Sequence, residues 1–419
     1  MQSEVKSVVV SGIDVHKKML AVVIAKAEAP DQPLEEKRFG TLPEELQKLR
    51  ERLEQLGVTD VVMESTAKYW KPVWMALEGS FRLHLAQALS NRAPRGRKSD
   101  FGDGRRLVRR WVAGDLRLSY VPPAEQRGWR LLTHTRAQYV RQVVRLRNQM
   151  EGLLEEAGIK LSGVVSDLFG SSGLRILEAL AAGEKDPAAL AALGDDRLRA
   201  SKETLEAALS GKVASAHQLL LRQHLEQLRE LRRQIQELDV AIGATLQEHG
   251  AAIERLCEVP GIAVTAAEQI VAEVGPEAAA FDSPEQMASW IGVCPGRQES
   301  AGESSSNRSP KGNRTMRSVL TQIAWAAVRT RESRWREWFS RWVSRLGPQK
   351  AIWAVAHRMA RLIWKLLHQG VRYQERELSQ LRPEVVARRK KRLLRELRKL
   401  GYEVALQQSN LNQPEAAQA

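Results

Sequence analysis

Cysteine is scarce in this sequence, and long apolar runs are missing. Cys257 and Cys294 are the two cysteines among 419 residues. Two are too few for a disulfide framework or, by themselves, for a zinc site, so we expect both to be small buried residues. No stretch approaches the roughly 18 apolar residues of a membrane-spanning helix, and the N-terminus has no signal-peptide pattern. These absences predict a cytoplasmic protein with no membrane partner.

Acidic residues are also in deficit. The 50 Asp and Glu residues are outnumbered by 65 Lys and Arg residues, which gives a formal net charge of +15. Because Arg binds phosphates with a planar fork of donors, this balance predicts a polyanionic partner, and nucleic acid is favoured over an anionic membrane surface. The hydrophobic content of 43% is that of a folded protein, and the length predicts two or three domains.

The first part of the chain has the pattern of a mixed α/β sheet. Apolar, β-branched runs alternate with helical patterns, as expected of strands joined by crossover connections. We predict strands at residues 7–14, 19–26, 36–39, 58–63 and 82–89, and helices at 43–56, 69–77 and from Asp100 onward.

Four acids in this region are candidate metal ligands. Asp14 and Glu64 each follow an apolar strand directly, where an acid is unusual unless it is paired or binds a metal. Asp100 and Asp103 are one helical turn apart, so both can reach one cation, although by themselves they could equally be ion-paired capping residues. Together the four oxygen ligands select Mg²⁺ or Mn²⁺ and suit phosphoryl transfer on a nucleic acid. We interpret His16 as a polar turn residue outside this set.

The rest of the chain is mostly helical. Residues 126–156 and 205–247 carry Leu at helical spacing and predict a coiled-coil-like antiparallel pair or an oligomerising helix. Near Gly261 we expect a helix-hairpin-helix-like turn, which could bind a phosphate or be a plain turn. A flexible loop is predicted at 294–314, followed by Trp-rich basic helices up to 367 and a basic helical tail at 387–398. The predicted domains are residues 1–125, 126–255, 256–375 and 376–419.

Several motifs in order resemble a known family. GIDVHK (12–17), MESTAKYW (63–70) and KSDFGD (98–103) resemble the three blocks of the DEDD transposases of the insertion sequence 110 (IS110) family. VPGI (259–262), WIGVCPGRQESAG (290–302) and SPKGNR (309–314) resemble the C-terminal transposase domain of that family. The resemblance implies an RNase H-like, RuvC-like N-terminal domain, long coiled-coil helices and a helical C-terminal domain.

The resemblance also implies how the protein acts. Ser300 occupies the position of the family's serine nucleophile, and the residues alone would not choose it over Ser304, Ser305, Ser306 or Ser309. Asp103 is followed by Gly104, where the family usually has Ala, and this change lowers helix propensity slightly. The implied catalytic set is Asp14, Glu64, Asp100, Asp103 and Ser300, with Mg²⁺ or Mn²⁺ on the four acids. The implied partners are donor and target double-stranded DNA, a structured noncoding guide RNA, and further copies of the chain as a dimer that forms a tetramer.

Three hypotheses follow from these observations. The first is a DNA transposase or recombinase that cuts and rejoins DNA by metal-assisted serine attack, in the cytoplasm and at the nucleoid when bound to DNA. The second is a RuvC-like, structure-selective endonuclease in which water attacks. The third is a non-catalytic protein that packages RNA or DNA with its Arg-rich helices.

Overall fold

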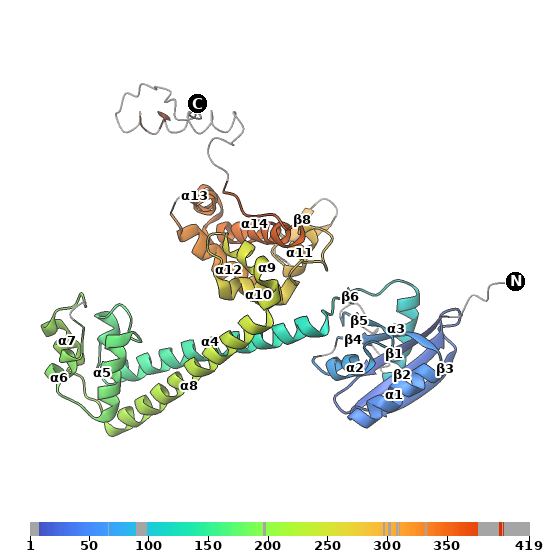
Figure 1. Ribbon diagram of the computed structural model, residues 1–419, viewed down its shortest axis with the longest axis horizontal. Coiled ribbons are helices and arrows are strands. Elements are labelled where there is room, and N and C mark those ends of the chain that lie inside the picture. Colours follow the sequence, from blue (N-terminus) through green and yellow to red (C-terminus); the bar gives the residue numbers. More distant parts are fainter. Residues whose placement is uncertain are drawn as a thin grey trace, which may run out of the picture. The chain divides into compact units, whose positions relative to one another are not determined.

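The computed structural model describes residues 8–65, 67–88, 99–195, 198–295, 298–300, 303–306, 309, 311–331, 333–375, 394–395 and 397. The chain divides into two compact units, Met1–Pro123 and Ala124–Ala419. The first unit is a mixed α/β sheet with helices, and the second is almost entirely helical (Figure 1). Most of the predicted basic tail at 387–398 lies outside the described residues.

The first unit is built on a six-stranded sheet with strand order β3-β2-β1-β4-β5-β6. β1 pairs with β2 in antiparallel and with β4 in parallel orientation, and β5 is parallel to β4. β3 and β6 are therefore the edge strands. The elements are β1 (Val9–Val15), β2 (Met19–Lys26), β3 (Pro33–Gly40), α1 (Pro43–Gln55), β4 (Val58–Glu64), α2 (Trp70–Leu77), β5 (Arg82–Ala86), α3 (Asp100–Val112) and β6 (Leu118–Ser119).

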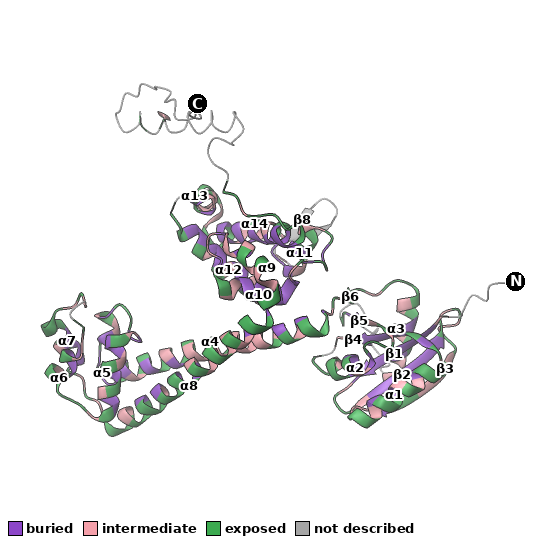
Figure 2. Ribbon diagram, viewed as in Figure 1, coloured by how far each residue is buried: buried purple, intermediate pink, exposed green. Residues whose placement is uncertain are grey.

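Helices cover both faces of this sheet. Because side chains alternate along a strand, Ile13 and Met63 pack with Leu49 of α1 and Leu77 of α2 on one face. The other face forms a smaller core in which α3 packs on β1, β4 and neighbouring strands, as Figure 2 shows by the burial of the central strands. Its members are Val10, Ala25, Val62, Ala86, Leu107 and Val108.

Two long helices begin the second unit and pack against each other. α4 (Ala124–Glu156) and α8 (Ser215–Thr245) lie side by side and run in opposite directions (Figure 1). Arg136 in α4 forms an ion pair with Asp239 in α8, and Met150 shares a core with Leu225. Shorter helices complete that core: η1 (Leu161–Gly163), α5 (Ser171–Ala182), α6 (Pro187–Ala192) and α7 (Lys202–Leu209).

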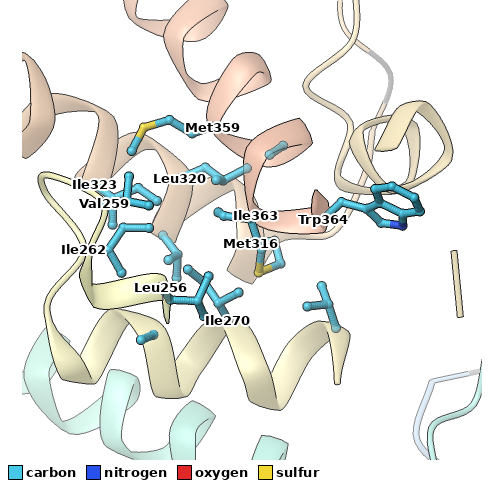
Figure 3. Close-up of a cluster of buried hydrophobic side chains, with 14 of the residues drawn as sticks. Leu256, Val259, Ile262, Ile270, Met316, Leu320, Ile323, Met359, Ile363 and Trp364 are labelled. Carbon is cyan, nitrogen blue, oxygen red and sulfur yellow. The ribbon is translucent and has the colours of Figure 1, made fainter. Parts of the chain in front are cut away.

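A second core in this unit holds the C-terminal helices together. Figure 3 shows its centre, where apolar side chains of α9, α10, α12 and α14 meet. Trp129 of α4 and Ile242 of α8 join the same core, so the long helices are packed into it. The elements are η2 (Gln247–His249), α9 (Gly250–Cys257), α10 (Val264–Val274), α11 (Pro284–Ile291), β7 (Gln298–Ser300), β8 (Glu303–Ser306), α12 (Arg314–Arg329), α13 (Arg334–Leu346) and α14 (Pro348–His368).

Gly261 lies in the turn between α9 and α10, where a helix-hairpin-helix-like segment was predicted. Its φ is +91°, and an added Cβ would lie 2.5 Å from the backbone nitrogen of Ala327 in α12. The glycine is therefore required both by the left-handed turn and by close packing on α12. The phosphate-binding alternative for this turn stays a prediction.

The sequence predictions of secondary structure hold for most described elements. The five predicted strands and the helices predicted from Pro43, Asp100 and Gln126 are confirmed within a few residues at most ends, the last beginning at Ala124. The helical stretch predicted at 205–247 is interrupted between α7 and α8. The short strand β6 was missed, and the stretch 294–314, predicted as a flexible loop, contains the β7–β8 hairpin. Within the described part of the chain, no helix combines the length and apolar character that a bilayer crossing needs.

Candidate functional site

Asp14 lies near the end of β1, on the face of the sheet that α3 covers. Val10, at an even-numbered position of the same strand, packs with Leu107 and Val108 of α3. Strand alternation places Asp14 on that side too, and it is only 8% exposed. A carboxylate is thus held beneath a helix at the end of a central strand.

Glu64 occupies the matching position on β4. The parallel register pairs Ile13 with Met63, so the next step along both strands sets Asp14 beside Glu64. Val62, two residues earlier in β4, faces α3, which gives Glu64 the same orientation. Glu64 is half-buried, and its charge contributes to raising the pKa of Asp14.

The other two acids come from the first turn of α3. Ser99 caps this helix by accepting a hydrogen bond from Gly102 N at 3.1 Å, and Asp100 is the first helical residue. Asp103 lies one turn further on the buried face of α3 and is 8% exposed. Ser99 provides the cap and Asp103 lies on the buried face of the helix, while Arg106 pairs with Asp103 and Arg38 pairs with Asp100, so the ion pairing of the alternative is present as well.

Two glycines bring α3 close to the sheet. A Cβ added at Gly12 would lie 2.4 Å from the carbonyl oxygen of Gly104, and one at Gly104 would lie 2.8 Å from Cγ2 of Val23. The helix therefore rests almost directly on β1, which brings Asp103 close to Asp14. From its sequence context Gly104 is only a weak helix former, whereas in the structure it permits this contact.

His16 belongs to the acidic cluster, contrary to the sequence prediction. It does lie in the turn after β1, but its Nε2 is 3.1 Å from Asp14 Oδ2 and 3.6 Å from Asp100 Oδ1. The sequence feature that could have identified His16 is its position two residues after Asp14, because side chains two residues apart lie on the same face of an extended chain. Ligand atoms of Asp14, His16 and Asp100 all lie within 4.8 Å of one another.

The electrostatics of the cluster favour a bound cation. Burial raises the pKa of Asp14, the charges of Asp103 and Glu64 raise it further, and His16 opposes the rise. Arg106 Nη2 donates to Asp103 Oδ1 at 2.5 Å, and Arg38 Nη2 donates to Asp100 Oδ2 at 3.4 Å. Arginines thus partly neutralise the outer acids, while Asp14 has no arginine partner among the described residues. Hard oxygen donors packed this closely fit Mg²⁺ or Mn²⁺.

A second polar cluster lies on β4 and β5, four residues before Glu64. Arg82 donates to Asp60 through Nε at 2.9 Å and Nη2 at 2.6 Å, and His84 Nε2 lies 2.9 Å from the same carboxylate. Burial alone raises the pKa of Asp60, but hydrogen bonds from Arg82, His84 and Thr59 outweigh it and lower the pKa to about 2. This cluster links β4 to β5 and holds the strand that ends in Glu64.

Ser300 is the last residue of β7 and pairs with Glu303 of β8. The structure thus places it beside the turn of a β-hairpin, and the side chains of this hairpin lie outside what the structure describes. Ser309, one of the alternative serines, accepts a hydrogen bond from the indole Nε1 of Trp353 at 2.9 Å. Ser304, Ser305 and Ser306 are in β8.

Glu273 anchors the chain just after the serine segment, and the sequence analysis did not identify it. It is 1% exposed, and its Oε2 accepts from Nδ2 of Asn313, the N-cap of α12, at 2.9 Å. His134 and Arg130 of α4 pair with the same carboxylate. Burial alone raises the pKa of Glu273, but these partners outweigh it and lower the pKa. The sequence feature that could have indicated Glu273 is an acidic residue within an otherwise apolar helical stretch.

The acids and Ser300 belong to different compact units. Asp14, Glu64, Asp100 and Asp103 lie in Met1–Pro123, whereas Ser300 lies in Ala124–Ala419. Each unit has its own hydrophobic core. The two candidate parts of the site are therefore supported by separate packing.

Comparison with known proteins identifies the family. Residues 11–159 match a DEDD model of the IS110 group described as "Transposase", and residues 253–340 match the model described as "Transposase IS116/IS110/IS902 family". The first match contains the four acids and the second contains Ser300. Together the two matches cover more than half of the chain.

Two relatives agree with these matches. A protein of Pseudomonas aeruginosa named "Probable family 20 transposase" is 27% identical over 332 residues, which cover 78% of this chain and 88% of the relative. A protein of Sinorhizobium fredii named "Putative transposase y4pF/y4sB" is 24% identical over 380 residues, which cover 89% of this chain and 87% of the relative. With both family models matched in order along the sequence, the chain belongs to the IS110 family of transposases.

Proposed function

We propose that this transposase cuts and rejoins DNA by metal-assisted attack of Ser300 on a phosphodiester. The observation that carries the proposal is the convergence of Asp14, near the end of β1, with Asp100 and Asp103 of the first turn of α3, with Glu64 on the adjacent strand. Clustered carboxylates in a strongly basic protein suit a reaction at a phosphate, where negative charge must be neutralised.

In this proposal the four acids hold Mg²⁺ or Mn²⁺, and the ring of His16 lies close enough to assist. When bound, the cation supplies Lewis-acid stabilisation of the charge that develops on the phosphate. Arg38 and Arg106, which donate to Asp100 and Asp103, orient these carboxylates. The RNase H-like, RuvC-like description of the sheet is part of the proposal, and the observed strand order is consistent with it.

The covalent step uses the Ser300 hydroxyl. Its oxygen bonds to phosphorus as the hydroxyl proton is lost, and the bond from phosphorus to a deoxyribose oxygen breaks, with that oxygen taking up a proton. The product is a phosphoserine link that preserves the energy of the phosphodiester. Attack by a DNA hydroxyl on this link reverses the step, so it rejoins a strand and regenerates serine.

We further propose that the site is composite. The family resemblance implies that the acids of one protomer meet the serine of another, and in this chain the two parts lie in different compact units. This supports a dimer on each DNA and a tetramer when donor and target are joined, with α4 and α8 as a coiled-coil dimerisation region. The domain division at 1–125, 126–255, 256–375 and 376–419 belongs to the same proposal.

Guidance by a structured noncoding RNA is the remaining part of the proposal. It is supported by family membership and by the net charge of +15, which suits backbone contacts to two nucleic acids. Pairing with the RNA would then select donor and target sequences. We infer action in the cytoplasm, at the nucleoid when the protein is bound to DNA.

The experiment compares variants on DNA that spans the ends of the element, with and without RNA transcribed from its flanking noncoding segment. Ser300→Ala is expected to abolish both strand cutting and the protein–DNA adduct seen on denaturing gels. Ser304→Ala and Ser309→Ala retain both activities. Asp14→Asn is expected to abolish cutting, whereas the exposed control Asp115→Asn retains it.

Three results would contradict parts of this proposal. Cutting without an adduct by Ser300→Ala would indicate the alternative, a RuvC-like endonuclease in which water attacks. Full activity of Asp14→Asn would exclude the acidic cluster from catalysis. Equal activity with and without the transcribed RNA would exclude guidance by that RNA.

A further inference from the structure

α13 presents a row of arginines, and several of them form no ion pair with a carboxylate of the described residues. Its sequence is RWREWFSRWVSRL, and Arg336, Arg341 and Arg345 are exposed. In the described residues no carboxylate forms an ion pair with Arg334, Arg341 or Arg358, the last of which lies on the neighbouring helix α14. Glu375 accepts a hydrogen bond from the backbone N–H of Arg334 rather than from its guanidinium.

Aromatic rings fix two of these guanidinium groups. The Arg358 guanidinium lies 4.3 Å from the Trp338 ring centroid and 5.0 Å from that of Trp342, and the Arg334 guanidinium lies 4.5 Å from Trp338. Trp338 and Trp342 are stacked on each other, with centroids 6.1 Å apart. Cation–π contacts orient a guanidinium but leave the N–H donors at its edge available.

The arrangement concentrates positive charge. Burial lowers the pKa of Arg358, and the charges of Arg334, Arg361 and Arg341 lower it further. Of these neighbours, Arg361 is paired with Glu285. Like charges held together without counterions destabilise the fold, and a bound polyanion would remove this cost.

We propose that α13 and the adjoining side of α14 form a docking surface for duplex DNA, with Arg334, Arg341 and Arg358 on backbone phosphates. Trp338 and Trp342 stack on guanidinium groups and on each other, so they are poorly placed to stack on unpaired bases. This favours a strand whose bases are paired. DNA is the substrate of the family, and the inference requires neither the metal site nor Ser300.

The test measures binding of the full chain to a fluorescent DNA duplex by anisotropy, in chelator and over a series of salt concentrations. The variant is Arg334→Gln, Arg341→Gln, Arg358→Gln. Its control, Lys202→Gln, Lys212→Gln, Arg222→Gln, removes the same charge from exposed positions at the start of α7, in the segment between α7 and α8, and in α8. Each lost phosphate contact lowers the slope of log K against log salt by about 0.9, so the variant is expected to lose about 3 in slope.

Affinity at about 0.1 M salt should fall more than tenfold for the variant and much less for the control. Equal slopes for variant and control would overturn the proposal. The proposal would also be overturned if the variant lost affinity only for duplex or single-stranded RNA and still bound DNA normally. If circular dichroism shows the triple variant unfolded, Arg341→Gln alone decides the matter, because its side chain is exposed. A slope loss of about 1 supports the proposal, and an unchanged slope refutes it.

Because the chelator removes divalent cations, the measured DNA binding does not depend on the proposed metal-assisted cleavage. A Ser300→Ala protein that no longer cuts DNA should still bind the duplex with an unchanged salt dependence. Failure of the serine mechanism and failure of the docking surface therefore give different results.

Discussion

Replacing Gly12 by Ala tests whether the contact between α3 and β1 assembles the acidic cluster. The new Cβ would lie 2.4 Å from the carbonyl oxygen of Gly104, whereas ordinary contacts begin at 3.4 Å, so the two backbones must separate by about 1 Å. β1 is held between two strands, so α3 is expected to move, with Asp100 and Asp103. Overpacking of this kind costs about 1–3 kcal/mol, and a 1 Å misplacement of catalytic groups costs about 10²-fold in rate.

The assay is Mn²⁺ binding to the full chain, followed by electron paramagnetic resonance, beside thermal unfolding of the same samples. Gly12→Ala should bind Mn²⁺ at least about tenfold more weakly, a change of about 1.4 kcal/mol. The control is Gly128→Ala in α4, where an added Cβ meets nothing within 4 Å and should leave Mn²⁺ binding unchanged. If folded Gly12→Ala binds Mn²⁺ as tightly as the natural protein, the helix contact does not position the ligands.

Three further predictions concern other residues. Asp60→Asn should lower the free energy of unfolding by about 2 kcal/mol at neutral pH, since the folded pKa is about 2 against an ordinary 3.8. A carboxyl group with a lowered pKa stabilises the folded protein above about pH 4, and this stabilisation is lost as the pH falls toward 2. In urea unfolding, the difference in free energy between the natural protein and Asp60→Asn should therefore shrink from about pH 4 to about pH 2. A difference that stays constant would contradict this. Glu273→Gln should cost about 2–3 kcal/mol in the unfolding of the helical unit, because buried partners lose a charged acceptor. His16→Ala should weaken Mn²⁺ binding about tenfold while the exposed control Lys17→Ala does not, and equal binding by both would place His16 outside the site.

Local patterns predicted most of the sheet and the strand-end positions of its acids. The β-branched runs ending at Asp14 and Glu64 are strands because their side chains fit a sheet buried on both faces, and the acids stand out against that apolar background. Ser99 and the acids after it predicted the start of α3, which the structure confirms. β6 has two residues and no periodicity, so no pattern could identify it.

Features that depend on distant contacts were not predictable. Gly104 looks like a weak helix residue until Gly12 of β1 is placed against it, and the two are far apart in the sequence. Glu273 gains its role from His134 and Asn313, which come from other helices. His16 was set aside because one sequence does not reveal that the start of α3 returns to the turn after β1. The serine hairpin has the composition of a loop, and its backbone pairing is not encoded in a strand pattern.

The two edges of the sheet restrict how copies of this chain can associate. β3 begins with Pro33 and carries Glu35, Glu36, Lys37 and Arg38 in succession, and at the opposite edge the two-residue β6 pairs with Leu85 and Ala86 of β5. Proline and charged side chains on an edge discourage an incoming strand, and at the other edge β6 covers the end of the five-residue β5, which leaves a short stretch open. A neighbouring protomer is therefore not expected to extend the sheet into a continuous β-structure. In the proposed assembly on DNA, copies would instead meet through side-chain surfaces, which can separate again without breaking a backbone ladder.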